Sequence, residues 1–321
     1  MNDIPYQPSE MDELDLSSLA DDKIKEGHKS GFVAVAGRPN VGKSTLMNAF
    51  LRQKLAAVSP RPQTTRSKQL GILTTADYQI IFVDTPGLVK PRHKLDEYMV
   101  DTANDSLRDA DIVLWLVDAA VSPGPGDRAI AKTFRDYPAD LALLLGLNKS
   151  DLLKPKDVLE RTRAYCSLVP EAAWLLFSAL KGDGLDALLQ IIIEMLPEGP
   201  RYYPIDQTTD YFIRDIAAEF IREQIFLQMR DELPYGAAVV IEKFEERENG
   251  VTYINSTIYV ERESHKKIII GKKGSQLQKI GSAARREIEE LVGSKVFLEM
   301  WVKVEPNWRK NKEVLKRLGY G

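Results

Sequence analysis

A short apolar run, a glycine-rich loop and a helix-forming segment follow one another at residues 31–53, and this order limits the fold more than any other feature. The run GFVAVAG is rich in small and β-branched apolar residues, which predicts a buried strand. The loop GRPNVGKST fits the pattern G-x-x-x-x-G-K-S, and the segment TLMNAFLRQ after it is expected to form a helix. Strand, loop and helix in this order are the setting of a phosphate-binding loop. We therefore expect an α/β nucleotide-binding domain.

The residues of this loop have separate expected tasks. Gly37 and Gly42 lack a Cβ and let the backbone approach phosphate oxygens, while N–H groups at the start of the helix favour negative charge. Lys43 is expected to reach the β- and γ-phosphates, and the Ser44 hydroxyl is expected to bind Mg²⁺. The residues expected to contact the nucleotide in this loop are Gly37, Asn40, Val41, Gly42, Lys43, Ser44 and Thr45.

Four further apolar runs predict strands with helical segments between them, namely YQIIFVD, DIVLWLVD, LALLLGLN and AAWLLF. Strands that alternate with helices form a mostly parallel sheet, and ligands bind beyond the carboxyl ends of its strands. The first of these runs continues into DTPG, so Asp84 and Gly87 are expected beside Mg²⁺ and the γ-phosphate. The alternative is that these four residues only make a turn.

The motif NKSD indicates which base the site selects. The carboxylate of Asp151 can accept hydrogen bonds from guanine N1–H and N2–H, whereas adenine offers no such pair of donors. Lys149 is expected to cover the plane of the base, and Asn148 is expected to brace the neighbouring loops. At the next strand end, the backbone N–H groups of Ser178 and Ala179 in SAL can donate to the guanine oxygen. Alone, NKSD could be a polar loop; together with the other motifs it predicts GTP and GDP as ligands.

The motifs GxxxxGKS, DTPG, NKSD and SAL, in this order, resemble the translation-factor class of GTPases. The segments GRPNVGKSTLMN, PQTTR and DTPGL resemble more closely the Era family of ribosome-assembly GTPases. This resemblance implies a switch I loop at about residues 59–68, in which Thr65, or alternatively Thr64, binds Mg²⁺ and senses the γ-phosphate. The residues alone would indicate only a polar loop there. The resemblance implies that Mg²⁺ is bound by Ser44, Thr65 and Asp84. It implies that hydrolysis depends on Lys43, Thr65 and Gly87.

Intrinsic GTP hydrolysis is expected to be slow. Small signalling GTPases place a water-orienting glutamine directly after the DxxG motif, where this chain has Leu88. The sequence also offers no residue that can be assigned as an arginine finger. In GTPases that resemble this one, an asparagine at the position of Asn40 is associated with a K⁺ ion at the phosphates. The alternative is that Asn40 caps or braces the loop.

A second domain is expected after the stretch LPEGPRYYPIDQTTD, whose prolines and turn-forming residues are typical of a linker. A helical segment comes first, then the strands AAVVIEKFEER and VTYINSTIYVER, the segment SHKKIII, the loop GKKG, a helix and the strand KVFLEMWVKV. This order resembles a prokaryotic-type KH domain, an α+β fold, with the signature I-I-G-x-x-G at residues 269–274. KH loops of this kind clamp about four nucleotides of single-stranded RNA.

The GKKG loop is the expected contact with RNA. Its glycines let the loop approach a nucleic-acid backbone, and its lysines add positive charge. Residues 261–286 hold eight Lys and Arg against two acids, although the whole chain has a net charge of −3, so a local surface for a polyanion is predicted. The alternative is a solvated helical face. Ile268, Ile270 and Ile280 could line the groove floor or belong to the core. The predicted RNA-binding residues are Ile270, Gly271, Lys272, Lys273 and Gly274.

The resemblance further implies binding near the 3′ end of small-subunit ribosomal RNA during assembly of the small ribosomal subunit. It implies residence in the cytoplasm with some peripheral association with the cell membrane, and we expect a monomer. The alternative is a GTPase whose C-terminal domain binds a protein or membrane partner instead of RNA. The GKKG loop and its neighbouring lysines distinguish the two readings.

The expected organisation is an acidic, disordered extension at residues 1–30, a GTPase domain at 31–196, a linker at 197–209 and a KH domain with its tail at 210–321. Residues 1–29 hold eight acids and three lysines with little periodicity, which is typical of a solvated tail. The longest apolar runs are too short to span a bilayer. Cys166 is the only cysteine, so an intrachain disulfide is excluded and a structural zinc site is not expected.

Overall fold

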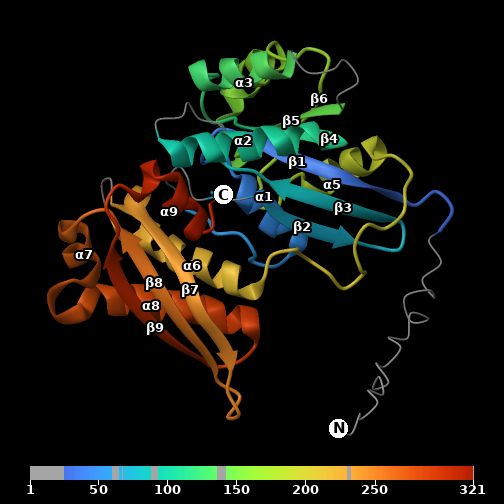
Figure 1. The fold of residues 1–321 in the computed structure, drawn as a ribbon. Helices are drawn as coiled ribbons and strands as arrows, with labels where there is room; N and C mark the ends of the chain where they lie inside the picture. The colour runs from blue at the N-terminus through green and yellow to red at the C-terminus, as the bar shows by residue number, and fades with distance from the viewer. Residues whose placement is uncertain are drawn as a thin grey trace, which may run out of the picture.

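The computed structural model describes residues 25–59, 65–66, 68–87, 93–135, 142–229 and 233–320. Within these ranges the chain forms a six-stranded sheet and a three-stranded sheet, each covered by its own helices (Figure 1). This arrangement confirms the predicted fold class. The predictions for Thr64, for Leu88 and for residues 1–24 of the acidic extension lie outside the described residues.

The larger sheet has the strand order β2-β3-β1-β4-β5-β6. Its strands pair in parallel except β2 with β3, which pair antiparallel. The strands are β1 Lys29–Gly37, β2 Gln69–Thr74, β3 Tyr78–Asp84, β4 Ile112–Asp118, β5 Ala142–Asn148 and β6 Ala173–Leu176. Five of these were predicted from their apolar runs.

Strand β2 was missed because its apolar run is short and interrupted. Its sequence QLGILT begins with a polar residue and contains Gly71. A Cβ at Gly71 would lie 2.7 Å from the Leu51 side chain and 2.9 Å from that of Met47, so a helix packs directly on this point of the strand. Close packing of this kind requires glycine in a strand, but it leaves no signal in the apolar pattern.

Helices cover both faces of this sheet. They are α1 Lys43–Leu51, α2 Lys94–Arg108, α3 Pro125–Arg135, α4 Val158–Cys166 and α5 Leu185–Met195. Side chains of α1 and α5 pack with one set of strand residues, and side chains of α2, α3 and α4 pack with the alternate set. Because each central strand is buried on both faces, its sequence is a nearly continuous apolar run, which is why these strands could be predicted.

The strand ends bring the polar motifs together. In the parallel register Val35 of β1 lies opposite Asp84 of β3, and Asp118 of β4 lies opposite Asn148 of β5. The loops that follow these strands therefore leave the sheet at the same edge, where ligands of such sheets bind.

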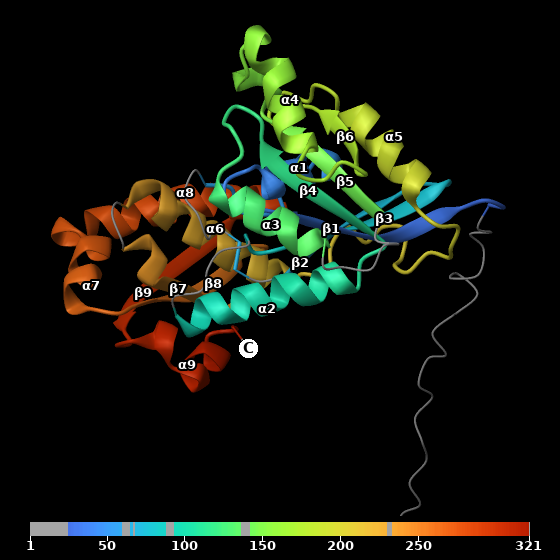
Figure 2. The ribbon, with the colours of Figure 1, turned by 90° about the horizontal axis from the view of Figure 1, so that it is seen from above.

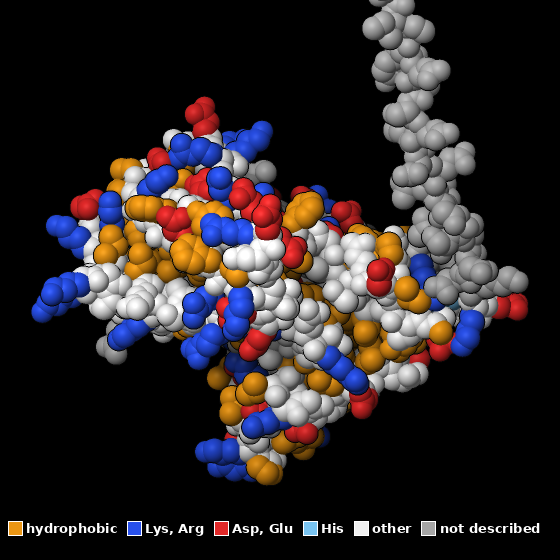
Figure 3. Space-filling view, turned by 90° about the horizontal axis from the view of Figure 1, so that it is seen from below, with side chains coloured by type: hydrophobic (Ala, Val, Ile, Leu, Met, Phe, Trp, Pro, Cys, Tyr) orange, Lys and Arg blue, Asp and Glu red, His pale blue; other side chains and the backbone are white. Residues whose placement is uncertain are grey.

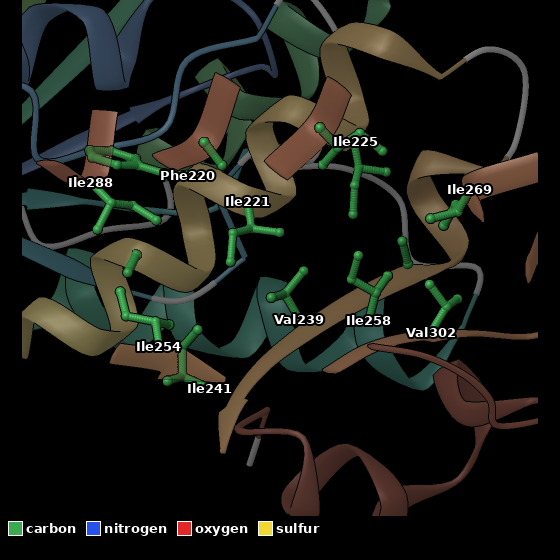
Figure 4. Close-up of a cluster of buried hydrophobic side chains, with 14 of the residues drawn as sticks. Phe220, Ile221, Ile225, Val239, Ile241, Ile254, Ile258, Ile269, Ile288 and Val302 are labelled. Carbon is green, nitrogen blue, oxygen red and sulfur yellow. The ribbon is translucent and has the colours of Figure 1, made fainter. Parts of the chain in front are cut away.

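The smaller sheet has the order β7-β8-β9, with β7 antiparallel and β9 parallel to the central strand. Its strands are β7 Ala237–Glu246, β8 Thr252–Val260 and β9 Val296–Val304. The helices of this half are α6 Ile213–Gln228, α7 Glu263–Ile270, α8 Ser275–Val292 and α9 Lys312–Arg317. Branched side chains from α6, α8 and the strands form its core (Figure 4). The predicted order of elements is therefore confirmed, with α9 as an addition.

The exposed fractions of single side chains refine the predicted helical segments of this half. Phe212 is 73% exposed and Ile213 is also exposed, because the buried face of α6 begins at Ile216. Ile280 is completely buried in the core, so of the two alternatives weighed for it the structure shows the core. Ile268 is 55% exposed beside the glycine loop.

The two halves of the molecule share contacts. Leu55, which follows α1, packs in the core of the smaller sheet. On the other side, Leu95 and Met99 of α2 pack with Trp308 and Leu315 of the C-terminal segment, and α2 lies beside α9 (Figure 2). The segment between the halves reaches the edge strand β2 near the end of the segment, where Ile72 N donates to Thr208 O at 2.8 Å. The domain boundaries themselves stay a prediction. In the described ranges, no helix combines the length and apolar character needed to cross a membrane.

Candidate nucleotide and nucleic-acid sites

The loop between β1 and α1 depends on its two outer glycines. Gly37 has φ 149°, and a Cβ there would lie 2.4 Å from the Leu116 carbonyl oxygen. Gly42 has φ 103°, and a Cβ there would lie 2.3 Å from Asn148 Nδ2. A side chain at either position would be strained and would collide with a neighbouring strand end. The loop is thus packed tightly against the ends of β4 and β5.

Asn40 has a conformational reason to be an asparagine. Its φ is 65°, in the left-handed region that asparagine adopts more readily than most residues. The residue is exposed at the mouth of the loop and lines the pocket described below. The loop-bracing alternative therefore has a physical basis, and the K⁺ role of Asn40 stays a prediction.

Lys43 lies beneath the loop with only 6% of its surface exposed. Its Nζ donates to the carbonyl oxygens of Arg38 at 3.1 Å and Gly37 at 3.4 Å. Burial lowers the pKa of Lys43, and the nearby charge of Asp84 acts in the opposite direction. A buried cation held by loop carbonyls is placed to meet a phosphate chain that enters the same loop.

Three oxygen-bearing side chains meet beside Lys43. Ser44 Oγ donates to Asp84 Oδ2 at 2.6 Å, and Thr65 Oγ1 donates to the same oxygen at 3.1 Å. The two hydroxyl oxygens lie 3.0 Å apart. Burial raises the pKa of Asp84, while Lys43, Ser44 and Thr65 act to lower it. All the residues predicted from the sequence to bind Mg²⁺ thus lie together.

This group of oxygens fits Mg²⁺. Asp84 is completely buried, and its second oxygen, Oδ1, has no hydrogen-bond partner among the described residues. A buried carboxylate oxygen without a partner is costly, and a hard cation that prefers oxygen ligands would satisfy it.

A pocket opens above this group. It is lined by the glycine loop and the start of α1 on one side and by Thr65 and Gly87 on another. Its remaining wall is Ala57, Val58 and Ser59. Ser59 begins the predicted switch I loop, whereas Ala57 and Val58 were not predicted. These small residues carry no motif, so only the fold of the chain after α1 shows that they reach the pocket.

Asn148 braces three segments, as predicted. Its Nδ2 donates to the Val41 carbonyl oxygen at 2.8 Å, and its Oδ1 accepts from Lys149 N at 2.8 Å and Ala179 N at 2.9 Å. One buried amide therefore joins the phosphate loop to the loops after β5 and β6. A guanine oxygen that approaches Ala179 N would share that donor with Asn148, while Ser178 N already donates to Asp183 O at 2.9 Å.

The other base-site residues are also held in place. Asp151 Oδ1 accepts from Ser178 Oγ at 2.6 Å, which orients the exposed carboxylate. Lys149 has φ 67°, and its Nζ lies 2.7 Å from Asp118 Oδ2. Asp118 was missed in the sequence analysis, although its place at the end of the run DIVLWLVD was a signal of the same kind as Asp84.

The GKKG loop has an unusual backbone. Gly271 has φ 72°, Lys273 has φ 51° and Gly274 has φ 78°, so three of the four residues are left-handed. A Cβ at Gly271 would lie 2.7 Å from the Gln276 Cβ, whereas a Cβ at Gly274 would meet nothing within 4 Å. The loop joins α7 to α8 directly, and both Lys272 and Lys273 are exposed.

Exposed basic side chains are frequent from the start of α7 through this loop and along α8. Figure 3 shows Lys and Arg side chains gathered at the end of the molecule formed by the smaller sheet and its helices. Ile270, directly before the loop, is partly buried against the core. The exposed basic residues of this region are Arg262, Lys267, Lys272, Lys273, Lys279, Arg285 and Arg286.

Both halves of the molecule are similar to known proteins. Residues 32–149 match the family model of a 50S ribosome-binding GTPase, and residues 232–309 match that of a KH domain. GTPase Era of Ruminiclostridium cellulolyticum is 47% identical over 293 residues, which are 91% of this chain and 98% of that protein. GTPase Era of Halothermothrix orenii is 46% identical over 298 residues, 91% of this chain and 99% of that protein. This chain belongs to the Era family of GTPases.

Solved Era structures share the arrangement of both halves. Era in complex with MgGDPNP and nucleotides 1506–1542 of 16S ribosomal RNA has a TM-score of 0.88 and 40% identity, covering 92% of this chain and 99% of that one. A single-residue variant of Aquifex aeolicus Era bound to GDP.AlF4⁻ has a TM-score of 0.87 and 40% identity, covering 91% of this chain and 99% of that one. The predicted family and the GTPase activity are thereby confirmed, whereas the roles of individual site residues stay predictions.

Proposed function

We propose that this Era-family GTPase binds GTP or GDP with Mg²⁺ at the loop between β1 and α1, and binds single-stranded ribosomal RNA at the GKKG loop. The RNA segment is taken to lie near the 3′ end of small-subunit ribosomal RNA, and the process to be assembly of the small ribosomal subunit. One observation supports the proposal above all: the same chain carries an exposed, basic GKKG turn with positive φ angles and a group of oxygen atoms, from Ser44, Thr65 and Asp84, that fits Mg²⁺. An Era structure that holds MgGDPNP and a 16S ribosomal RNA fragment together supports it.

The residues of the nucleotide site have distinct proposed roles. Lys43 would hold the β- and γ-phosphate oxygens, and the backbone N–H groups before α1 would hold their remaining charge. Ser44, Thr65 and Asp84 would hold Mg²⁺, which when bound supplies positive charge to the phosphate oxygens. Gly87 would stand at the γ-phosphate, where a Cβ would lie 2.8 Å from the Pro39 side chain. Because the residue after DTPG in the sequence is a leucine, which cannot orient water through a polar side chain, intrinsic hydrolysis is proposed to be slow.

Asp151 is proposed to select guanine. Ser178 holds one oxygen of its carboxylate, which leaves the group oriented to accept the two guanine donors. Replacement Asp151→Asn should weaken GTP binding and favour xanthosine triphosphate, whose base edge presents a carbonyl in place of the amino group. Competition binding with the triphosphates of guanosine, adenosine and xanthosine measures this. Equal affinity of the unaltered protein for GTP and ATP would contradict guanine selection.

The RNA-binding proposal is tested by reversing the charge of the loop. Lys272→Asp with Lys273→Asp leaves both glycines of the turn and introduces repulsion where the RNA phosphates should lie. We expect RNA affinity to fall about 10- to 100-fold, and the log–log salt dependence to become shallower by about 0.7 for each RNA phosphate that the variant no longer neutralises. A fluorescent single-stranded fragment from the 3′ end of small-subunit ribosomal RNA, titrated over a salt series, gives both quantities.

The matched control changes two lysines elsewhere in the same half of the molecule. Lys310 and Lys312 are both exposed beside α9, so Lys310→Asp with Lys312→Asp gives the same change in net charge. This control should keep RNA affinity within about threefold, because long-range charge effects are screened. If a folded loop variant binds RNA as tightly as the control, the C-terminal half binds a protein or membrane partner instead.

Three finer points rest on the resemblance and belong to the same proposal. K⁺ beside Asn40 would add positive charge at the phosphates. Peripheral association with the cell membrane would occur from the cytoplasmic side. The protein would act as a monomer. None of these adds a residue to either site beyond those already named.

A further inference from the structure

Arg66 follows Thr65 directly, and its side chain lies inside the other half of the molecule. Only 1% of its surface is exposed. Its Nη1 donates to the Ala237 carbonyl oxygen at 2.8 Å, and its Nη2 donates to the Tyr235 carbonyl oxygen at 2.9 Å. Ala237 begins β7, and Tyr235 lies in the turn directly before it, in the half of the molecule formed by residues 213–320, which we call the KH half.

Aromatic rings enclose the same guanidinium. Its central carbon lies 5.7 Å from the ring centre of Trp308, 5.9 Å from that of Tyr320 and 6.0 Å from that of Phe226. Burial lowers the pKa of Arg66. A buried guanidinium is costly unless its donors are satisfied, so paired carbonyls and ring faces define one favourable position for this side chain. Arg66 is therefore held by contacts that the GTPase half alone does not supply.

The position of Arg66 restricts that of Thr65. Consecutive Cα atoms are about 3.8 Å apart, so the backbone of Thr65 stays close to that of Arg66 while Arg66 is held. Thr65 Oγ1 lies 3.0 Å from Ser44 Oγ and 3.1 Å from Asp84 Oδ2. A single peptide bond therefore joins Thr65, a member of the oxygen group that fits Mg²⁺, to a residue held in the KH half.

A second part of the pocket wall is held by the KH half as well. Val58, in the pocket wall, donates its backbone N–H to Glu223 Oε1 of α6 at 3.1 Å. The other oxygen of Glu223 lies 2.8 Å from Lys54 Nζ. The described parts of the chain between α1 and β2 are thus attached to the KH half at two places, through Val58 and through Arg66.

We propose that Arg66 is a positioning residue through which the KH half holds Thr65 at the Mg²⁺ and γ-phosphate position. The inference rests on the proposed role of Thr65. Because GDP has no γ-phosphate, loss of the anchor should weaken binding of a GTP analogue more than binding of GDP. The kcat of GTP hydrolysis should fall, while selection of guanine over adenine nucleotides should change less.

The first variant is Arg66→Met in the full chain, which removes the guanidinium but fills much of its space. The matched control is Arg222→Met. Arg222 is also buried and also stacks on Phe226, at 5.5 Å, but it pairs with Glu219 within α6 and is not a chain neighbour of Thr65. For each, the affinities for a non-hydrolysable GTP analogue with Mg²⁺ and for GDP are measured, with thermal unfolding followed by circular dichroism.

We expect Arg66→Met to lower the ratio of GTP-analogue affinity to GDP affinity about tenfold, which corresponds to roughly 1.4 kcal/mol. Arg222→Met should leave this ratio within about twofold, since it disturbs the same ring without touching Thr65. If both variants lower the ratio equally, the effect belongs to the aromatic cluster in general and the proposal is wrong. Arg66→Lys keeps the positive charge but loses the paired guanidinium donors, so it should give an affinity ratio between those of the unaltered protein and Arg66→Met. If Arg66→Met does not fold, Arg66→Lys takes its place in the test.

Thr65→Ala separates this inference from the proposed site. If Thr65→Ala leaves the affinity ratio unchanged, the proposed role of Thr65 fails and the inference fails with it. If Thr65→Ala lowers the ratio, adding Arg66→Met to it should cause little further loss, because Arg66 acts through Thr65. Additive losses in the double variant, or an unchanged ratio in a folded Arg66 variant, would overturn the inference alone.

Discussion

The molecule has two glycine–lysine loops that differ in how they present the same residue types. In the loop before α1, Lys43 is buried, and both flanking glycines lie where a Cβ would collide with a strand end. In the loop before α8, both lysines are exposed, and a Cβ at Gly274 would meet nothing within 4 Å. The first loop is enclosed by the edge of a parallel sheet and is shaped for one compact phosphate chain. The second is an open turn between two helices, suited to an extended backbone that passes over it.

The difference shows that a glycine–lysine motif alone does not predict which ligand a loop binds; the elements before and after the loop are also needed. A strand before the loop and neighbouring strand ends beside it create an enclosed site, because parallel strands end at one edge. A helix on each side of the loop places it at the surface, with the N-terminus of the second helix directed outward. Substitutions in the two loops should therefore have effects of very different size.

The largest effect is expected from Lys43→Ala. Removal of a buried cation that faces the phosphates loses charge-assisted hydrogen bonds worth together about 3–4 kcal/mol, or roughly 10³-fold in GTP affinity. Equilibrium binding of a fluorescent GTP analogue measures it. Lys154→Ala, at an exposed lysine of the same half, serves as control and should keep affinity within about twofold. A loss of less than tenfold for Lys43→Ala would remove the contrast between the two loops.

A smaller difference is expected between two glycine substitutions. Gly42→Ala combines φ 103° with a Cβ only 2.3 Å from Asn148 Nδ2, so it should lower the free energy of unfolding by about 2–4 kcal/mol. Gly274→Ala has φ 78° but open space, so it should cost about 1 kcal/mol. Chemical denaturation of both variants gives the two values. Equal costs would mean that the first loop is no more enclosed than the second.

The smallest effect concerns the monovalent ion. If Asn40 supports K⁺ at the phosphates, GTP turnover should be about tenfold faster in K⁺ than in Na⁺, which corresponds to roughly 1.4 kcal/mol of the barrier. RNA binding at equal ionic strength should not distinguish the two ions, because screening depends on concentration and charge. Single-turnover hydrolysis in the two salts decides the matter. Identical rates would leave Asn40 with its left-handed backbone role only.

Most of the nucleotide site could be predicted because each motif follows a strand that is buried on both faces. Asp84 and Asn148 were placed by the apolar runs before them, and the structure brings their loops together. Strand β2 could not be predicted in the same way, since Gly71 and polar residues break its pattern. Asp118 had the signal of a strand end but no motif, and its contact with Lys149 appears only in the folded sheet.

Contacts between the two halves could not be predicted from the sequence. Arg66 lies in a polar stretch, and nothing in that stretch shows that its partners are carbonyl groups about 170 residues later. Ala57, Val58 and Ser59 reach the pocket because Glu223 and Leu55 attach this part of the chain to the KH half. Such contacts join segments distant in sequence, and local patterns of charge and apolarity do not record them.

The claim that the two loops serve two different phosphate ligands can be checked by a crossed titration. The unaltered protein, the Lys43→Ala variant and the Lys272→Asp, Lys273→Asp variant are each titrated with a fluorescent GTP analogue and, without nucleotide, with the single-stranded RNA fragment. We predict that Lys43→Ala loses GTP and keeps RNA within about threefold, and that the double variant does the reverse, because exposed charges far from a ligand are screened. Loss of both ligands in either variant, with folding intact by circular dichroism, would contradict the claim.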